Sequence, residues 1–121
     1  MGTNTSILHL ALRADWDEAL IEGEYRTSTR GLTLEEVGFI HASFPDQVAA
    51  TAGRFYGDAL DDLLVLGLDG DAIAAAGVDV RHEDVGIGEL FPHIYGALDP
   101  GWVRSVVSYR DWAESPRDAA K

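Results

Sequence analysis

Histidines are the residues in this 121-residue sequence best suited to chemistry. His9, His41 and His93 each lie within or beside a short apolar run, whereas His82 stands among charged residues and is interpreted as a solvated surface group. An imidazole among apolar neighbours needs partners for its ring nitrogens, and one with a pKa near neutrality can move protons. Taken singly, each is a hydrogen-bonded core or cleft residue. Taken together, they predict a shared cleft in which His41 and His93 are candidate catalytic groups.

The stretch 88–96 is the second region suited to chemistry. It places Glu89, His93 and Tyr95 between glycines, a composition typical of a shaped loop over a pocket. Glu89 is the third candidate catalytic residue, because a carboxylate can stabilise an oxocarbenium-like centre. The alternative is that Phe91 and Tyr95 fill the core. Three histidines with Glu89 could also bind zinc, but no pair has the close spacing of a typical site, so no metal is predicted.

Several residues are candidates for ligand binding. Ser43 follows His41 by two positions, so both side chains should lie on the same side of an extended chain. A serine hydrolase is disfavoured, since no Gly-x-Ser-x-Gly motif surrounds Ser43. Arg13 and Arg54 are scarce positive charges that could hold a phosphate or a carboxylate, although lone arginines are commonly surface groups. The ligand-binding set that we predict is His9, Arg13, Tyr25, Ser43 and Tyr95.

Short strands and helices must position these residues. Two short helices are expected, one capped by Asp15 and ending near Gly23, and one starting at Ser43 and Pro45 and ending at Gly57. The continuous apolar run at 63–68 predicts a central buried strand. The remaining expected elements are strands at 7–11, 39–43, 78–81, 93–95 and 102–109, an extended segment at 25–28, and single helical turns within 31–38 and 72–76.

Composition limits the classes of function. The chain suits one α+β domain at 7–113, with disordered ends at 1–6 and 114–121. It has no cysteine, which excludes disulfides and thiolate chemistry, and its net charge of −12 disfavours nucleic acid as a partner. The N-terminus lacks a secretory signal and no run is long enough to span a membrane, so we expect a cytoplasmic protein without a membrane partner.

Four motifs carry a resemblance to a known family. They are His9–Ala11, Gly23–Arg26, Gly38–Ser43 and Gly88–Gly96. Together they resemble the bacterial domain-of-unknown-function family 952 over about residues 7–109 of this sequence. That family is in turn similar to the ADP-ribosyltransferase-like fold, which includes the RNA 2′-phosphotransferases. The resemblance implies a small mixed or antiparallel split sheet that grips NAD or an ADP-ribose derivative.

Two functions follow from this resemblance. In the first, His9 and His41 hydrogen bond to a ribose or diphosphate, Tyr25 or Tyr95 stacks on a ring, and Glu89 supports ADP-ribosyl transfer. No cofactor is certain, and NAD is a candidate substrate. In the second, the domain binds a small molecule without turnover, because neither Glu89 nor His93 stands in the Glu-x-Glu motif of the transferases. Both functions make a small molecule the expected partner.

Overall fold

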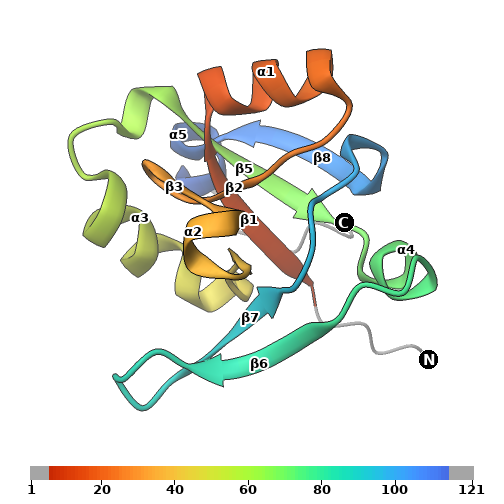
Figure 1. Cartoon of the computed structure of the whole chain (residues 1–121). Coiled ribbons are helices and arrows are strands. Elements are labelled where there is room, and N and C mark those ends of the chain that lie inside the picture. The colour runs from red at the N-terminus through yellow and green to blue at the C-terminus, as the bar shows by residue number, and fades with distance from the viewer. Residues whose placement is uncertain (1–5, 115–121) are drawn as a thin grey trace.

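The computed structural model describes residues 6–114 and folds them into three small antiparallel sheets and five short α-helices (Figure 1). The predicted α+β class is confirmed. The strands are β1 (Ile7–Leu12), β2 (Thr27–Thr29), β3 (Leu32–Thr33), β4 (Ile40–His41), β5 (Leu63–Leu68), β6 (Val80–Asp84), β7 (Leu90–Ile94) and β8 (Val103–Ser108). The helices are α1 (Arg13–Glu22), α2 (Leu34–Val37), α3 (Val48–Tyr56), α4 (Gly70–Ala75) and α5 (Tyr109–Glu114), with 3-10 turns at Pro45–Gln47, Leu60–Asp62 and Pro100–Trp102.

The first sheet has the order β1-β5-β8 and forms the centre of the molecule (Figure 1). Every residue of β5 is buried, which confirms the predicted central strand. Side chains alternate across a strand, so Leu64 and Leu66 pack into one apolar cluster while Leu63 and Val65 pack into another on the opposite face. The first sheet is therefore covered on both faces.

The same alternation decides where His9 points. Ile7 and Ala11 of β1 belong to the cluster that contains Leu66, whereas Leu8 and Leu10 belong to the other cluster. His9 lies midway between Ile7 and Ala11 and so shares their face. This face looks toward the second sheet.

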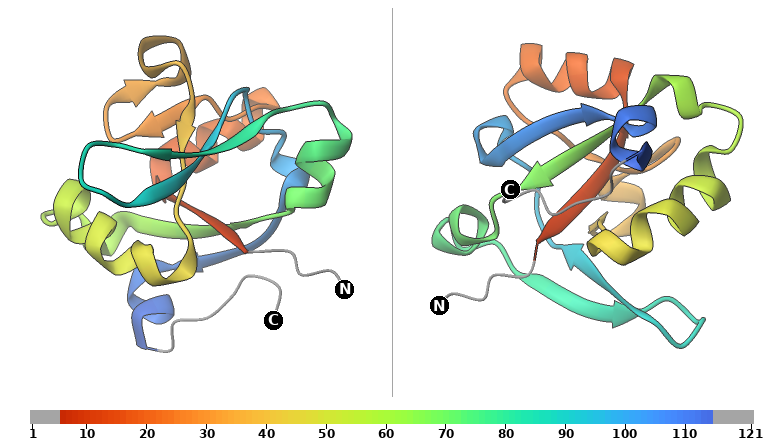
Figure 2. Two further views of the ribbon diagram at one scale, coloured as in Figure 1. Left: turned by 90° about the horizontal axis from the view of Figure 1, so that it is seen from below. Right: turned by 180° about the vertical axis from the view of Figure 1, so that it is seen from behind.

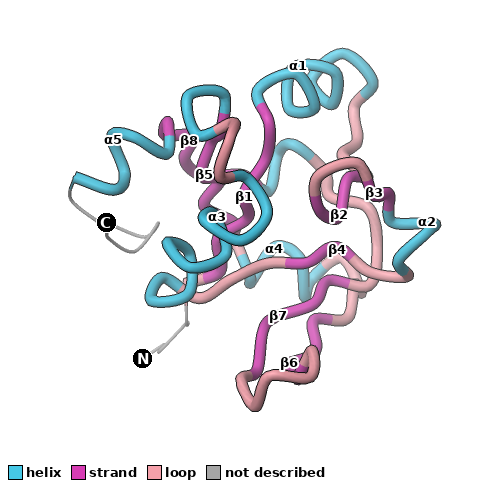
Figure 3. The backbone as a smooth tube through the Cα atoms, turned by 90° about the vertical axis from the view of Figure 1, so that its left-hand side faces the viewer, coloured by secondary structure: helices cyan, strands magenta, loops and turns pink. Residues whose placement is uncertain are grey.

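The second sheet has the order β4-β7-β6, with β6 and β7 joined as a hairpin that extends from the body (Figures 1 and 2). Its register pairs Ile40 with Ile94 and His41 with His93. Ile40 and Ile94 are fully buried in the cluster shared with the first sheet. His41 and His93 therefore lie together on the opposite face of the second sheet, where β4 runs beside β7 (Figure 3).

Two predicted helix caps are wrong. β1 runs directly into α1, whose N-cap is Leu12, so Asp15 lies in the first turn and caps nothing. The predicted end at Gly23 is confirmed by its left-handed φ of 85°. The helical segment does begin at Pro45, as predicted, but its N-cap is Phe44, whose backbone N–H donates to the side chain of Gln47. The backbone of Ser43 instead pairs with that of Leu8.

The C-terminal part also differs from the prediction. β6 extends to Asp84, which places His82 and Glu83 on a strand instead of in a polar loop. The predicted helical turns correspond to α2 and α4, but α5 was not expected, and it includes Glu114, for which disorder was predicted. The rest of the predicted disordered ends, residues 1–5 and 115–121, lies outside the described residues. No helix within 6–114 is long and apolar enough to cross a membrane.

Candidate functional site

His9 joins the two sheets through both of its ring nitrogens. Its Nδ1 donates to the carbonyl oxygen of His41 at 2.7 Å, and its Nε2 accepts from the hydroxyl of Tyr25 at 2.8 Å. Burial lowers the pKa of His9 to about 4, and the hydrogen bond to the His41 backbone only partly opposes this shift. The imidazole is therefore neutral at pH 7. Since both nitrogens are bonded within the protein, neither is open to a ligand.

Tyr25 should matter for stability through this contact. Its ring is buried, with no face open for stacking on a ligand. Tyr25→Phe would leave the buried Nε2 of His9 without a donor, so we expect it to lower the free energy of unfolding by about 1–3 kcal/mol. Urea denaturation would measure this. Tyr109→Phe is the matched control, expected to change stability by less than about 0.5 kcal/mol because Tyr109 is half-buried and stacks on Trp112. Equal stability of both variants would contradict the role of the Tyr25 hydroxyl.

His41 and His93 form a side-by-side pair on the second sheet. Their ring centroids are 5.3 Å apart, and Nδ1 of His41 lies 3.3 Å from Nε2 of His93. Phe39 stacks on His93 at 3.9 Å with nearly parallel rings, and Phe91 lies 5.0 Å from His41. The three histidines are therefore neighbours: the ring of His9 contacts the backbone carbonyl of His41, and the ring of His41 contacts the ring of His93. A cleft shared by all three rings stays a prediction.

Glu83 is a further member of this group that the sequence interpretation missed. Its Oε1 lies 2.9 Å from Nδ1 of His93 and also accepts from the hydroxyl of Tyr95 at 2.6 Å. The Tyr95 and His93 hydrogen bonds hold the pKa of Glu83 below its usual range. The register of the β6–β7 hairpin brings Glu83 into the group: Arg81 pairs with His93 and Glu83 with Phe91, so these side chains share one face.

His41 faces a small hollow on its other side. This His41 hollow is lined by five hydroxyl-bearing residues and one apolar residue, and it has room for about one water molecule. Nε2 of His41 is buried and has no hydrogen-bond partner among the described residues. The lining residues besides His41 are Ser28, Thr29, Ser43, Thr51, Tyr56 and Leu10.

The electrostatics of the hollow favour a neutral His41. Burial is the main cause that lowers the pKa of His41 to about 4, and His93, His9 and Arg54 act in the same direction. The backbone N–H of His41 donates to the hydroxyl of Ser28 at 3.1 Å, which fixes the strand against the hollow. At pH 7 the side chains that line the hollow therefore carry no formal charge.

Two exposed side chains of α3 stand beside the hollow. Phe55 is 41% exposed, and its ring centroid lies 6.4 Å from that of His41. The guanidinium of Arg54 lies 6.0 Å from the Phe55 ring. Of the two predicted anion-binding arginines, Arg54 therefore lies near the histidines. Arg13 is exposed at the start of α1.

Two of the other predicted site residues, Ser43 and Tyr95, lie near the histidines, and Glu89 is bonded elsewhere. Ser43 lines the hollow with His41, as their spacing predicts. Tyr95 is bonded to Glu83 and lies beneath the guanidinium of Arg81, 4.4 Å from the ring. Glu89 instead accepts from the side-chain amide of Gln47 at 3.0 Å, so the carboxylate bonded to the histidine pair is Glu83.

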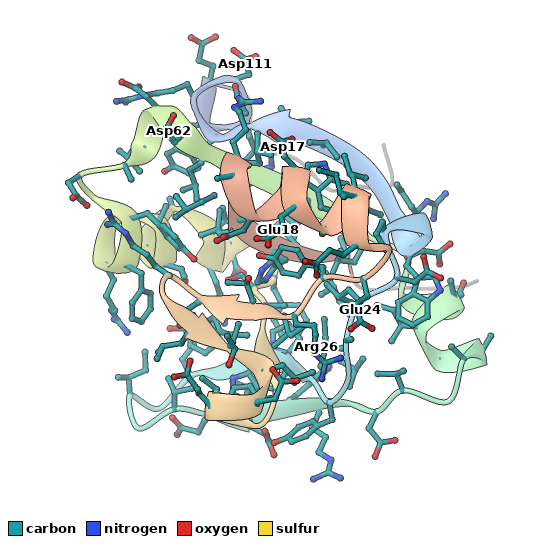
Figure 4. The ribbon with its side chains drawn as sticks, turned by 45° about the horizontal axis from the view of Figure 1, so that its top comes forward. Asp17, Glu18, Glu24, Arg26, Asp62 and Asp111 are labelled. Carbon is teal, nitrogen blue, oxygen red and sulfur yellow. The ribbon has the colours of Figure 1, made fainter. Side chains whose placement is uncertain are left out.

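A larger cleft of about 130 Å³ lies between α1 and the chain that follows it. Figure 4 shows Glu18 and Glu24 on this side of the molecule, with Arg26 beside them. Burial and the charge of Glu18 raise the pKa of Asp15, which is also part of the lining. The concentration of carboxylates makes this acidic cleft a poor place for a phosphate.

Comparison of the sequence with models of known protein families shows to which family the chain belongs. The sequence model of the family described as "Protein of unknown function (DUF952)" matches residues 10–106. The chain belongs to this DUF952 family. No curated protein matches the sequence.

This DUF952 chain is also similar in structure to a solved protein, CC0527 from Caulobacter crescentus. Its crystal structure aligns with a TM-score of 0.71 at 29% identity, covering 85% of this chain and 84% of that one. A double mutant of CC0527 gives 0.70 at 30% identity with the same coverage, and its solution NMR structure gives 0.68 at 27% identity, covering 87% and 84%. The likeness extends over most of both chains.

The described part of the DUF952 chain contains no group of three or more histidine, aspartate or glutamate side chains arranged to hold a metal ion. The chemistry that the site can perform is hydrogen bonding at the unpaired nitrogen of His41 and among the surrounding hydroxyls. These groups are matched to a small polar ligand group that can both donate and accept a hydrogen bond.

Proposed function

We propose that this chain binds a ribose-containing small molecule of the NAD or ADP-ribose class, with one sugar hydroxyl in the His41 hollow. The observation that carries the proposal is the buried Nε2 of His41, which has no partner among the described residues, in a side chain that lines a hollow together with Ser43 and Thr51. A sugar hydroxyl can donate to this nitrogen and accept from Ser43 or Thr51. It is also the size of the single water that the hollow can hold, and it would replace the hydrogen bonds of that water.

The remainder of such a ligand would extend over α3. In a chain with a net charge of −12, the guanidinium of Arg54 is a positive charge that acts on His41, and it would hold a diphosphate. The exposed ring of Phe55 offers a stacking surface to a base. The resemblance of the histidine motifs to the ADP-ribosyltransferase-like fold favours the same class of ligand.

Binding without turnover is the form of this function that the site supports best. A base with a pKa of about 4 is a good hydrogen-bond acceptor at pH 7, but it is far below the pKa that suits a general base there. Among the described residues, none of the side chains lining the hollow is a carboxylate that could stabilise an oxocarbenium ion. ADP-ribosyl transfer is the second candidate, favoured by the contact between Glu83, His93 and His41.

Incubation of the purified protein with NAD and with ADP-ribose separates these functions. We expect both ligands to stabilise the fold, by about 2.7 kcal/mol at 100 times the dissociation constant. Stabilisation without release of nicotinamide supports binding alone, whereas release that is abolished in His41→Ala supports transfer. Absence of any thermal shift with either ligand at millimolar concentration would contradict the proposal. Ribose-free pyrophosphate serves as the control ligand and should give the smaller shift.

A further inference from the structure

We propose that Glu83 is a positioning residue that acts through His93 to keep the proton of His41 on Nδ1, so that the hollow accepts only a ligand group that donates a hydrogen. The inference deepens the proposed function, on which it rests for the identity of the ligand. It also makes a statement about the free protein, namely which nitrogen of each imidazole carries the proton.

The carboxylate of Glu83 is the first member of a row of hydrogen-bonding groups that leads to His41. Glu83 is ionised at neutral pH, since its pKa is held low by the hydrogen bonds from Tyr95 and His93. An ionised carboxylate can only accept hydrogen bonds. Nδ1 of His93, 2.9 Å from Oε1 of Glu83, must therefore carry a hydrogen.

The row continues from His93 to His41. In the neutral form of His93 the single ring hydrogen lies on Nδ1, which leaves Nε2 as an acceptor. That nitrogen faces Nδ1 of His41 at 3.3 Å, and one of the two must donate. The donor is then Nδ1 of His41, which leaves an open lone pair on Nε2, the buried nitrogen that has no partner among the described residues; the side chain that carries it lines the hollow.

Packing keeps both rings in this arrangement. His93 is only 2% exposed and lies flat against Phe39, and the Tyr95 hydroxyl holds the carboxylate of Glu83 from a second direction. The backbone of His41 is tied to Ser28. Rotation of either imidazole would break these contacts, so the rings keep their orientation. Glu83 then determines which ring nitrogen of each histidine donates and which accepts.

The consequence is selectivity by hydrogen-bond direction. A hydroxyl or amine can donate to the open nitrogen of His41, whereas a carboxylate or carbonyl oxygen would place one lone pair against another and leave both unpaired. The hollow should therefore distinguish the hydroxyl of a sugar from the carboxyl group of a corresponding acid of similar size. An imidazolium at His93 would donate from its Nε2 to Nδ1 of His41 and so place the His41 hydrogen on Nε2. The hollow would then prefer a ligand group that accepts a hydrogen bond.

The test is NMR of the full chain labelled with nitrogen-15 in its histidine rings, recorded at pH 7.5 without ligand. We expect Nδ1 to be protonated and Nε2 bare in both His41 and His93. Glu83→Ala should convert part of the His41 population to the form protonated on Nε2. Glu83→Gln should restore the wild-type pattern, because its amide oxygen can still accept from His93. Glu89→Ala is the control carboxylate and should leave the pattern unchanged.

Two results would overturn the inference. The first is a protonated Nε2 on His41 in the wild type, which can be seen without any variant. The second is unchanged protonation of the His41 ring nitrogens in folded Glu83→Ala. Failure of the proposed function is visible separately. If ADP-ribose does not bind while the ring hydrogens are as expected, the positioning by Glu83 stands and the ligand class is wrong. If ADP-ribose binds while Nε2 of His41 is protonated, the ligand class stands and the positioning is wrong.

Discussion

Lowering the pH from 7.5 to 5 should remove about 4 kcal/mol from the free energy of unfolding through His9 and His41. Burial lowers the pKa of each from 6.5 to about 4 in the folded protein. In the unfolded chain both bind a proton as the pH falls through 6.5, while the folded protein resists protonation until about pH 4. The unfolded state thus binds more protons in this window, and each histidine contributes a loss of about 2 kcal/mol at pH 5.

Urea denaturation at pH 7.5, 6 and 5 measures this dependence. His41→Ala should retain about half of the loss, because His9 alone remains buried and neutral. His82→Ala is the control, since His82 is exposed, and it should keep the full dependence. Stability that stays level between pH 7.5 and 5, or rises on acidification, would mean that His9 and His41 are not buried as neutral imidazoles.

Ile94→Ala should destabilise the protein by about 2–5 kcal/mol, the usual cost of removing a fully buried Ile side chain. Ile94 is 0% exposed and pairs with Ile40 directly beside the His41 and His93 pair. It anchors the second sheet to the apolar cluster beneath the first sheet. A cavity at this position would therefore loosen the strand that carries His93.

The matched control is Ile87→Ala in the turn of the β6–β7 hairpin. Ile87 is 48% exposed, so its truncation should change the free energy of unfolding by less than about 0.5 kcal/mol. Chemical denaturation of the two variants compares the same substitution at buried and exposed positions. A small effect of Ile94→Ala, similar to that of Ile87→Ala, would contradict the packing of the second sheet on the first.

Sequence reasoning predicted those elements whose signals are local. The continuous apolar run from Leu63 to Leu68 marked β5, and the glycines at 23 and 57 marked the ends of α1 and α3. The start of α1 was misplaced because Asp15 and Glu18 imitate a capping box, while β1 continues without a break into the helix. α5 was missed since its first residues follow directly from the valine-rich β8.

The candidate site was predictable only in part. Two-residue spacing placed His41 and Ser43 on one side, and apolar surroundings indicated which histidines point inward. Glu83 could not be distinguished from Glu89 without the pairing of β6 with β7, which is a tertiary property. The same holds for Thr51, which lines the hollow because α3 packs beside β1.

Calorimetric titration of ADP-ribose into the wild type and His41→Ala tests the central claim most directly. We expect the substitution to weaken binding by at least about tenfold, equivalent to about 1.4 kcal/mol, while His82→Ala binds like the wild type. Thr51→Val, which removes a hydroxyl from the hollow without a change in shape, provides a second variant if His41→Ala does not fold. Equal affinity of ADP-ribose for the wild type and for folded variants of the hollow would contradict the account.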